Sequence, residues 1–216
     1  YLNMPDATTL SGMTNKGTLM TAAELNDANF ESQLTAQKFP ESYKAYLRSL
    51  HKTYPEWKFV ALHTNIDFNT AVSNEIPKSC IEVNSGHGTN DACGSESASW
   101  AMADEVSVKY FMDPRNFLDK ESIFMFEDLS SYENVTETMV QRILNNSFMS
   151  GKSSSDNKNY ATLFMEAGRT NHINPVYLAS LVIQEVGRSG DKIQVSGKSF
   201  DWYGIRYSSL YNFYNI

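Results

Sequence analysis

The stretch NPVYLASLVIQEVG, residues 174–187, constrains the fold more than any other part of the chain. Asparagine is a preferred N-cap residue, proline fits the first helical position, and glycine fits the position just past a helix end. These signals predict one helix that is capped by Asn174, begins at Pro175 and ends before Gly187. The residues between are almost all apolar, as in a helix that is buried in a core. The fold must therefore provide a helical body around this segment.

One acid, Glu185, interrupts this apolar helix near its end. At about 100° per residue, Leu178, Leu181 and Val182 point within roughly 40° of this acid, so it shares a stripe with apolar side chains. It also lies in the last turn, where the helix dipole disfavours negative charge. Both effects favour the protonated carboxyl group near neutral pH, which is the form that a general acid needs. The alternative is a solvated surface glutamate, or one that pairs with Arg188.

The bulk composition excludes several classes of protein. With 216 residues, the chain is long enough for one large domain, or one domain with an appendage. Its net charge of −7 argues against a general affinity for nucleic-acid phosphates. No run of the sequence approaches the ~18 apolar residues that a membrane-spanning helix needs, so we expect no membrane insertion. The chain opens with Tyr1 and without a visible secretion signal, as expected of an excised fragment.

The sequence divides at about residue 35. Residues 1–35 are mixed and polar, which predicts an extended arm with one short helix at 21–30, and a compact domain is expected over 36–216. Helical spacing or capping residues predict the following helices within that domain: 40–54, 67–75, 97–112 (capped by Ser97 or Ser99), 121–129, 135–148, 160–172 and 174–187.

Strands are fewer in this pattern. WKFVALHT, residues 57–64, is predicted to be the one clear strand of the first half, whereas the turn-rich stretch 76–97 is predicted to be a long loop. After Gly187, the chain is rich in glycine, serine and aromatic residues, which favours two short strands joined by turns. The expected fold class is α+β: a mostly helical body with a small β-hairpin late in the chain.

The two cysteines, Cys80 and Cys93, lie in the predicted loop. They could pair as a local staple or remain free, and either state fits a cytosolic or a secreted protein. His87, Asp91 and Glu96 share this loop with Cys93, but their spacing matches no zinc signature, so we expect no metal site.

Three motifs, in this order, resemble one enzyme family. They are YFMDPRNFLDKESIFMFEDLS at 110–130, YATLFMEAGRTNHINPVYLASLVIQEVG at 160–187, and SLYNFYNI at 209–216. Together they are similar to glycoside hydrolase family 73, and in particular to the clostridial-type endo-β-N-acetylglucosaminidase domains of cell-wall autolysins. The resemblance covers roughly 36–216. It implies a lysozyme-like fold in which the late β-hairpin forms one wall of the cleft, and cleavage of the GlcNAc-β-1,4-MurNAc linkage of peptidoglycan.

The resemblance also assigns residues. The family's catalytic glutamate falls on Glu185, and its Tyr-Asn motif falls on Tyr211 and Asn212, which would line the cleft. Many members carry a second acid on the β element, but only Asp191 and Asp201 follow Glu185 here. Asp201 is the preferred second acid, and the alternative nucleophile is the substrate's own 2-acetamido group. Family chains run on past residue 216, so we expect the C-terminus to be trimmed.

Aromatic and acidic side chains are further candidates for substrate contact. Glu127 lies among aromatic residues and could line the groove or pair with Arg115. Four phenylalanines near it are expected in the core: Phe111, Phe117, Phe124 and Phe126. The aromatic residues of the late segment are better candidates for stacking on sugar rings: Trp202, Tyr203, Tyr207 and Tyr214.

The resulting expectation is a secreted, cell-wall-associated, bacteriolytic hydrolase that acts as a monomer. Its partner would be the glycan strand of peptidoglycan. It would need no cofactor, because a proton donor and a nucleophile suffice for glycoside hydrolysis. Two alternatives remain open at this point: a lytic transglycosylase on the same glycan, and a wall-binding module that has no catalytic activity.

Overall fold

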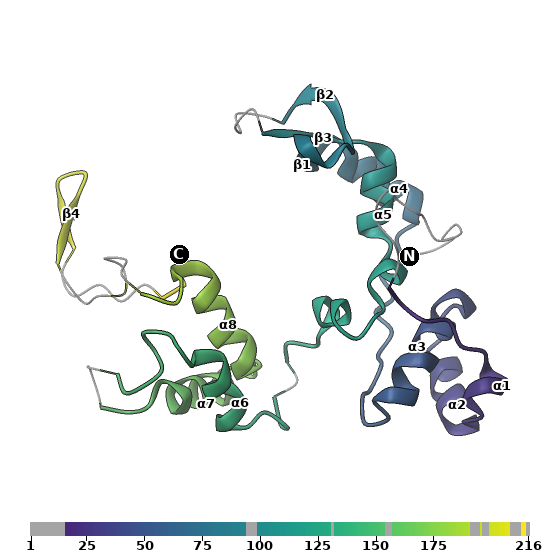
Figure 1. The fold of residues 1–216 in the computed structure, drawn as a ribbon, viewed down its shortest axis with the longest axis horizontal. Helices are drawn as coiled ribbons and strands as arrows, with labels where there is room; N and C mark the ends of the chain where they lie inside the picture. The colour runs from purple at the N-terminus through teal and green to yellow at the C-terminus, as the bar shows by residue number, and fades with distance from the viewer. Residues whose placement is uncertain are drawn as a thin grey trace. The chain divides into compact units, whose positions relative to one another are not determined.

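The computed structural model describes residues 16–93, 99–130, 132–153, 157–190, 195, 199–207 and 213–214, and for Asn90, Phe200 and Trp202 it describes the backbone alone. The chain divides into two compact units, 1–127 and 128–216. Helices and small antiparallel sheets occur together (Figure 1), so the predicted α+β class is confirmed. Within the described ranges, no helix is both long enough and apolar enough to cross a bilayer.

Unit 1 begins with three helices: α1 (Ala22–Leu25), α2 (Ala28–Ala36) and α3 (Glu41–Thr53). The short helix predicted at 21–30 is present as α1 and the start of α2, but α2 continues to Ala36, beyond the predicted end. The reason is local capping together with burial: the Asp27 carboxylate accepts from the Phe30 backbone N–H at 2.9 Å, and Phe30 and Leu34 are buried against Leu47 of α3.

The predicted strand at 57–64 does not form. The segment keeps a strand's alternation, because Phe59 and Ala61 are half-buried whereas Val60 and Leu62 are 76% and 87% exposed. However, its backbone pairs with one side chain instead of a neighbouring strand. The Gln37 amide donates to the Phe59 carbonyl at 2.7 Å and accepts from the Ala61 N–H at 2.8 Å. A sequence pattern can predict an extended backbone, but whether a strand pairs depends on which neighbour the fold supplies.

The middle of unit 1 holds a three-stranded antiparallel sheet of order β1-β3-β2 (Figure 1). Its elements are α4 (Phe68–Glu75), η1 (Ile76–Lys78), β1 (Cys80–Glu82), η2 (Val83–Ser85), β2 (Gly88–Ala92), β3 (Trp100–Ala103) and α5 (Glu105–Met112). The prediction of a loop over 76–97 is therefore wrong, because β1 and β2 lie within it. The helix predicted from residue 97 starts at Glu105, after Asp104, whose carboxylate accepts from the Ser107 N–H at 2.7 Å.

Cys80 and Cys93 form a disulfide with a Cα–Cα distance of 5.8 Å. The bond joins β1 to the end of β2, the two strands that flank β3 in the sheet. Such short strands bury little apolar surface, so a covalent link between them contributes much of the local stability. Of the two states that the sequence leaves open, paired or free cysteines, the structure shows the paired one.

Unit 1 ends with two 3-10 helices, η3 (Pro114–Phe117) and η4 (Ser122–Phe126). The helix predicted over 121–129 is therefore shorter and of a tighter type. The DPRN sequence before it builds a buried ion pair, in which Arg115 donates from Nε to Asp113 Oδ1 at 2.9 Å and from Nη2 to Oδ2 at 2.7 Å. Both side chains are almost fully buried, and such a paired geometry is what makes burial of two charges tolerable.

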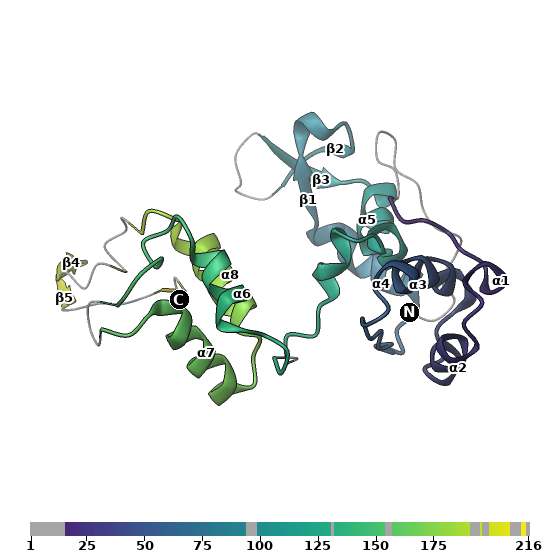
Figure 2. The ribbon, with the colours of Figure 1, turned by 60° about the horizontal axis from the view of Figure 1, so that its bottom comes forward.

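Unit 2 is a three-helix body followed by a hairpin. The helices are α6 (Glu137–Leu144), α7 (Tyr160–Asn171) and α8 (Pro175–Val186), and the strands are β4 (Phe200–Trp202) and β5 (Ile205–Tyr207). The three helices lie side by side in both views (Figures 1 and 2). Their shared core contains Val140, Leu144, Phe164, Met165 and Val182. The predicted hairpin after Gly187 is confirmed.

Candidate active site

The helix predicted from its capping residues, α8, forms as expected. The Asn174 side chain accepts from the backbone N–H groups of Val176 at 2.8 Å and Tyr177 at 3.4 Å, so it satisfies two donors that helix geometry leaves unpaired. Pro175 occupies the first helical position, and Gly187 follows the last one with a φ of 74°. The helix is therefore fixed at both ends by the residues that the sequence places there.

Glu185 lies in the last turn of α8 and is half-buried. The buried face of the helix consists of Pro175, Ala179, Val182 and Val186. Two of these, Val182 and Val186, are close to Glu185 along the helix and are 0% and 3% exposed. The acid thus leaves the helix at the edge of the core. Its side chain is neither sealed inside the core nor fully exposed.

The start of α8 is held against α7 by a contact that only glycine permits. A Cβ atom on Gly168 would lie 2.6 Å from the Ile173 carbonyl oxygen and 2.6 Å from Pro175 Cγ. Both neighbours are rigid, one being backbone and the other a proline ring. Gly168 therefore sets how closely the two helices approach, and with that the position of α8 in unit 2.

The turn after Glu185 is fixed to α6. Arg188 donates to the carbonyl oxygens of Ile143 at 3.2 Å and Asn145 at 2.9 Å, and its own carbonyl accepts from the Phe148 N–H at 2.9 Å. A guanidinium group at the C-terminal end of α6 also suits the negative end of the helix dipole. Arg188, the cation considered as a partner for Glu185, is therefore used to fasten this turn to the helical body.

The hairpin that follows carries Asp201, the preferred second acid. β4 and β5 pair with Asp201 opposite Arg206, and the loop residues Tyr203 and Gly204 have positive φ values of 46° and 76°, as in a two-residue hairpin turn. The Asp201 carboxylate accepts from Arg206 Nη1 at 2.7 Å, and both side chains are more than 60% exposed. Asp201 is therefore a solvated acid whose carboxylate is held by a guanidinium partner.

The aromatic candidates of unit 2 differ in accessibility. Tyr203 is 91% exposed at the tip of the hairpin, and Tyr207 is 36% exposed on β5. Tyr214 is half-buried against the helical core, and this burial raises its pKa, so it packs as a core residue and is not an open platform. Tyr211, Asn212 and the side chain of Trp202 lie outside the described residues, as does Asp191.

Glu127 and its aromatic neighbours belong to unit 1. Glu127 is exposed at the end of η4, and Arg115 forms an ion pair with Asp113. The prediction that four nearby phenylalanines lie in the core is wrong for three of them. Phe111 of α5 is 47% exposed. Phe124 and Phe126 of η4 are 56% and 48% exposed, because a 3-10 helix of one or two turns cannot bury every side of an apolar run.

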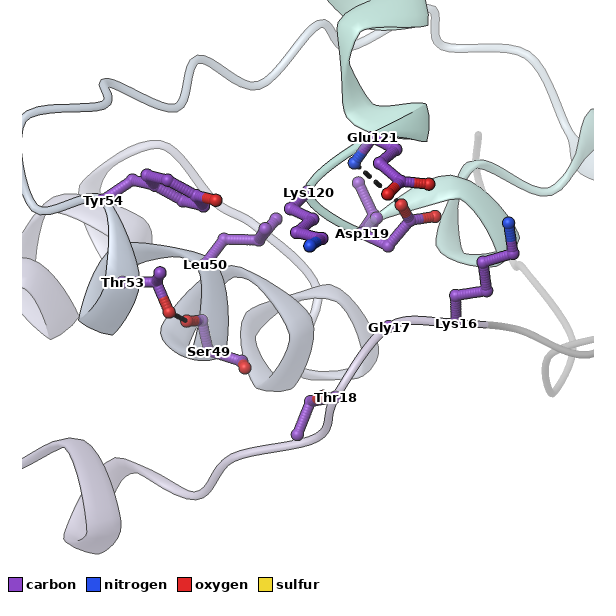
Figure 3. A pocket seen from close by; sticks show the side chains of 11 residues that line it. Lys16, Gly17, Thr18, Ser49, Leu50, Thr53, Tyr54, Asp119, Lys120 and Glu121 are labelled. Atoms are coloured by element: carbon purple, nitrogen blue, oxygen red, sulfur yellow. Dashed lines mark hydrogen bonds between the residues drawn. The ribbon is translucent and has the colours of Figure 1, made fainter.

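A hollow of about 280 Å³ in unit 1, which we call the α3 hollow, was not predicted from the sequence (Figure 3). It lies between residues 16–18, the end of α3 and residues 118–121, and it combines charged, hydroxyl and apolar side chains. Its parts are far apart in the sequence, and each is unremarkable alone, so no sequence signal could have found it. A second hollow, of about 470 Å³, lies over α6 at Glu137, Gln141 and Arg142, and Glu185 lines neither.

Metal chemistry finds no support in the described ranges, where no group of three or more histidine, cysteine, aspartate or glutamate side chains could hold an ion. The described part of unit 2 offers a half-buried carboxyl group at the end of α8 and, further along the chain, an exposed hairpin that carries tyrosines and an acid. Comparison with models of protein families, with characterised proteins and with solved structures gives no significant match to this chain.

Proposed function

We propose that the chain is a peptidoglycan hydrolase that cleaves the GlcNAc-β-1,4-MurNAc linkage, with Glu185 as the general acid. The observation that carries this proposal is the half-buried position of Glu185 in the last turn of α8, next to Val182 and Val186. The three ordered motifs of the sequence support it, because they resemble autolysin endo-β-N-acetylglucosaminidases of glycoside hydrolase family 73. On this proposal, unit 2 has a lysozyme-like arrangement, with the β4–β5 hairpin as one wall of the glycan cleft.

In the proposed reaction, Glu185 donates its proton to the glycosidic oxygen as the bond from C1 to that oxygen breaks. The positive charge that develops at C1 is taken up by the 2-acetamido oxygen of the same sugar, which forms a cyclic intermediate. Water then adds to C1 as the bond between C1 and the acetamido oxygen breaks, and a proton of that water passes to the Glu185 carboxylate. Asp201 could instead activate water directly, but its carboxylate already accepts a 2.7 Å hydrogen bond from Arg206, so we favour the acetamido route.

The hairpin and the motif after it would orient the substrate. Tyr203 and Tyr207 present exposed rings, and aromatic rings offer the broad apolar faces on which a sugar ring can pack. Trp202, Tyr211 and Asn212 enter this proposal through the family resemblance alone. Glu127 is retained as a residue that contacts substrate, on the basis of its exposure in the motif at 110–130.

The disulfide supports a location outside the cytosol. Structural disulfides persist in oxidising compartments and are rare where thiols are kept reduced. The Cys80–Cys93 bond therefore fits a secreted, wall-associated protein. We propose that it acts as a monomer, needs no cofactor, and has peptidoglycan glycan strands as its partner.

The test is muropeptide analysis of purified walls digested by the wild-type chain and by Glu185→Gln. Loss of a general acid typically costs 10²–10⁴-fold in rate, so we expect release by Glu185→Gln to fall at least about a hundredfold. Glu166→Gln is the matched control, because Glu166 is an exposed glutamate of α7 that pairs with Lys158 at 2.8 Å.

Each class of product identifies one function. New reducing-end GlcNAc supports the proposal, whereas 1,6-anhydro-MurNAc would identify a lytic transglycosylase. Tight wall binding with no release by the wild-type chain would identify a module without catalytic activity. Equal release by the wild type and Glu185→Gln would remove Glu185 from the mechanism.

A further inference from the structure

The α3 hollow in unit 1 has the features of a binding site that is separate from the Glu185 region. Buried Leu50 of α3 and buried Leu118 provide its apolar lining, and Ser49 and Thr53 add hydroxyl groups. Its volume of about 280 Å³ is close to the ~300 Å³ lower end of small-molecule sites. The hollow is thus large enough for a few small residues of a peptide, but too small for a folded partner.

Charges of both signs line this hollow. Lys16 and Lys120 bring ammonium groups, and Asp119 and Glu121 bring carboxylates (Figure 3). Within the part of the chain that the structure describes, both lysines are exposed and neither forms an ion pair with an acid. Their charges are therefore available to a ligand.

Asp119 is held in place by the backbone that follows it. It is 7% exposed, and its Oδ1 accepts from the N–H groups of Glu121 at 2.8 Å and Ser122 at 3.0 Å. Burial alone raises the pKa of Asp119, but the hydrogen bonds from Ser122 and Glu121, with the nearby charge of Lys16, outweigh it and leave the pKa lowered. The hollow therefore keeps a fixed negative charge of Asp119 beside the positive charges of two exposed lysines.

An aromatic run continues from the rim of the hollow. Tyr54, which lines it, stacks on Trp57 with ring centroids 4.1 Å apart and planes 9° apart. Trp57 in turn meets the exposed ring of Phe124 edge-on at 5.5 Å. Half-exposed rings in series next to a charged hollow suit a ligand that joins a sugar to a charged peptide.

We propose that the α3 hollow binds the peptide stem of peptidoglycan, with the muramic acid sugar that carries it lying along Tyr54 and Trp57. A stem peptide has free carboxylates for Lys16 and Lys120, and the amino group of its diamino acid suits Asp119 or Glu121. A polyanion such as a wall phosphate polymer fits less well, because the two carboxylates of the hollow would repel it. The inference rests on the proposed function for its choice of substrate, and it assigns peptide recognition to unit 1.

The test is a calorimetric titration of the whole chain with each of three probes. The probes are N-acetylmuramic acid bearing a lysine-type pentapeptide, N-acetylmuramic acid alone, and inorganic phosphate. We expect the peptide-bearing probe to bind at least tenfold more tightly than either of the others. Lys120→Glu should weaken that binding by roughly tenfold, since it replaces a charge-assisted contact with repulsion. Lys78→Glu, at an exposed lysine elsewhere in unit 1, should leave it unchanged.

Three results would overturn the inference: equal affinity for the sugar with and without peptide, tighter binding of phosphate, or identical affinity of the wild type and Lys120→Glu. The proposed function is tested separately, with glycan strands from which an amidase has removed the stems. If the wild-type chain cuts these strands but binds the sugar equally well with and without peptide, only the inference on the α3 hollow fails. If it binds the peptide but cuts no glycan, only the hydrolase proposal fails.

Discussion

Gly168 provides the sharpest structural prediction, because its replacement by alanine should push α8 away from α7. The new Cβ would lie 2.6 Å from both the Ile173 carbonyl oxygen and Pro175 Cγ, and 3.0 Å from Pro175 Cδ. Overpacking of this kind costs about 1–3 kcal/mol, and rigid neighbours place Gly168→Ala near the upper end. Alanine regains about 1 kcal/mol of helix propensity over glycine. The net loss of unfolding free energy is therefore expected to be about 2 kcal/mol.

The measurement is thermal unfolding of the whole chain, with hydrogen exchange of peptides from α7 and α8 to locate the effect. For a chain of 216 residues, about 2 kcal/mol corresponds to a fall in Tm of roughly 4–8 °C. Gly151→Ala is the matched control, because a Cβ there would meet nothing within 4 Å and the position has no positive φ. If Gly168→Ala were as harmless as Gly151→Ala, Gly168 would not set the spacing of the helices, and the account of how α8 is positioned would fail.

Three further predictions concern unit 1. Replacing Cys80 and Cys93 by serine should cost about 3 kcal/mol, the value expected for a closed loop of about this length, as measured by urea unfolding with and without reductant. Gln37→Ala should free the backbone that its amide holds, so that the Ala61 N–H exchanges at least tenfold faster, with little change in α3. Burial raises the pKa of Asp104, but hydrogen bonds from Ser107 lower this pKa by more, so the net shift is a decrease. Because its folded-state pKa lies below the unfolded value, its stabilising contribution is present above about pH 4 and is lost as the pH falls through the lowered pKa, and this loss should be smaller in Asp104→Asn.

The correct sequence predictions depend on residues whose effect is local. The caps of α8 and the two-residue hairpin turn at Tyr203 and Gly204 follow from conformational preferences that act within a few residues. Long-range pairing is where prediction fails. The strands β1 and β2 were missed because their polar, turn-rich sequence becomes a sheet only when β3 lies between them and the disulfide joins them.

The candidate site likewise combines features that follow from local sequence with features that depend on tertiary contacts. The position of Glu185 at the edge of an apolar stripe follows from helical spacing, and the structure gives it a half-buried side chain as that spacing predicts. By contrast, the pairing of Asp201 with Arg206 depends on hairpin register, and the α3 hollow depends on three segments that meet only after folding. Tertiary contacts of this kind carry no signature in a single sequence.

In unit 2, the residue that carries the candidate carboxyl group differs from the residues that fix the position of its helix. The position of Glu185 follows from three contacts that hold α8. Asn174 caps the start of α8, Gly168 sets the distance between α8 and α7, and Arg188 hydrogen-bonds the turn after α8 to the end of α6. None of these three groups needs to touch a substrate. On the proposed function, the position of α8 sets where the Glu185 carboxyl group meets the glycosidic oxygen, and a misplacement of about 1 Å can cost roughly a hundredfold in rate. Gly168→Ala should therefore lower the rate of glycan cleavage more than its stability loss alone explains, and Gly151→Ala should not.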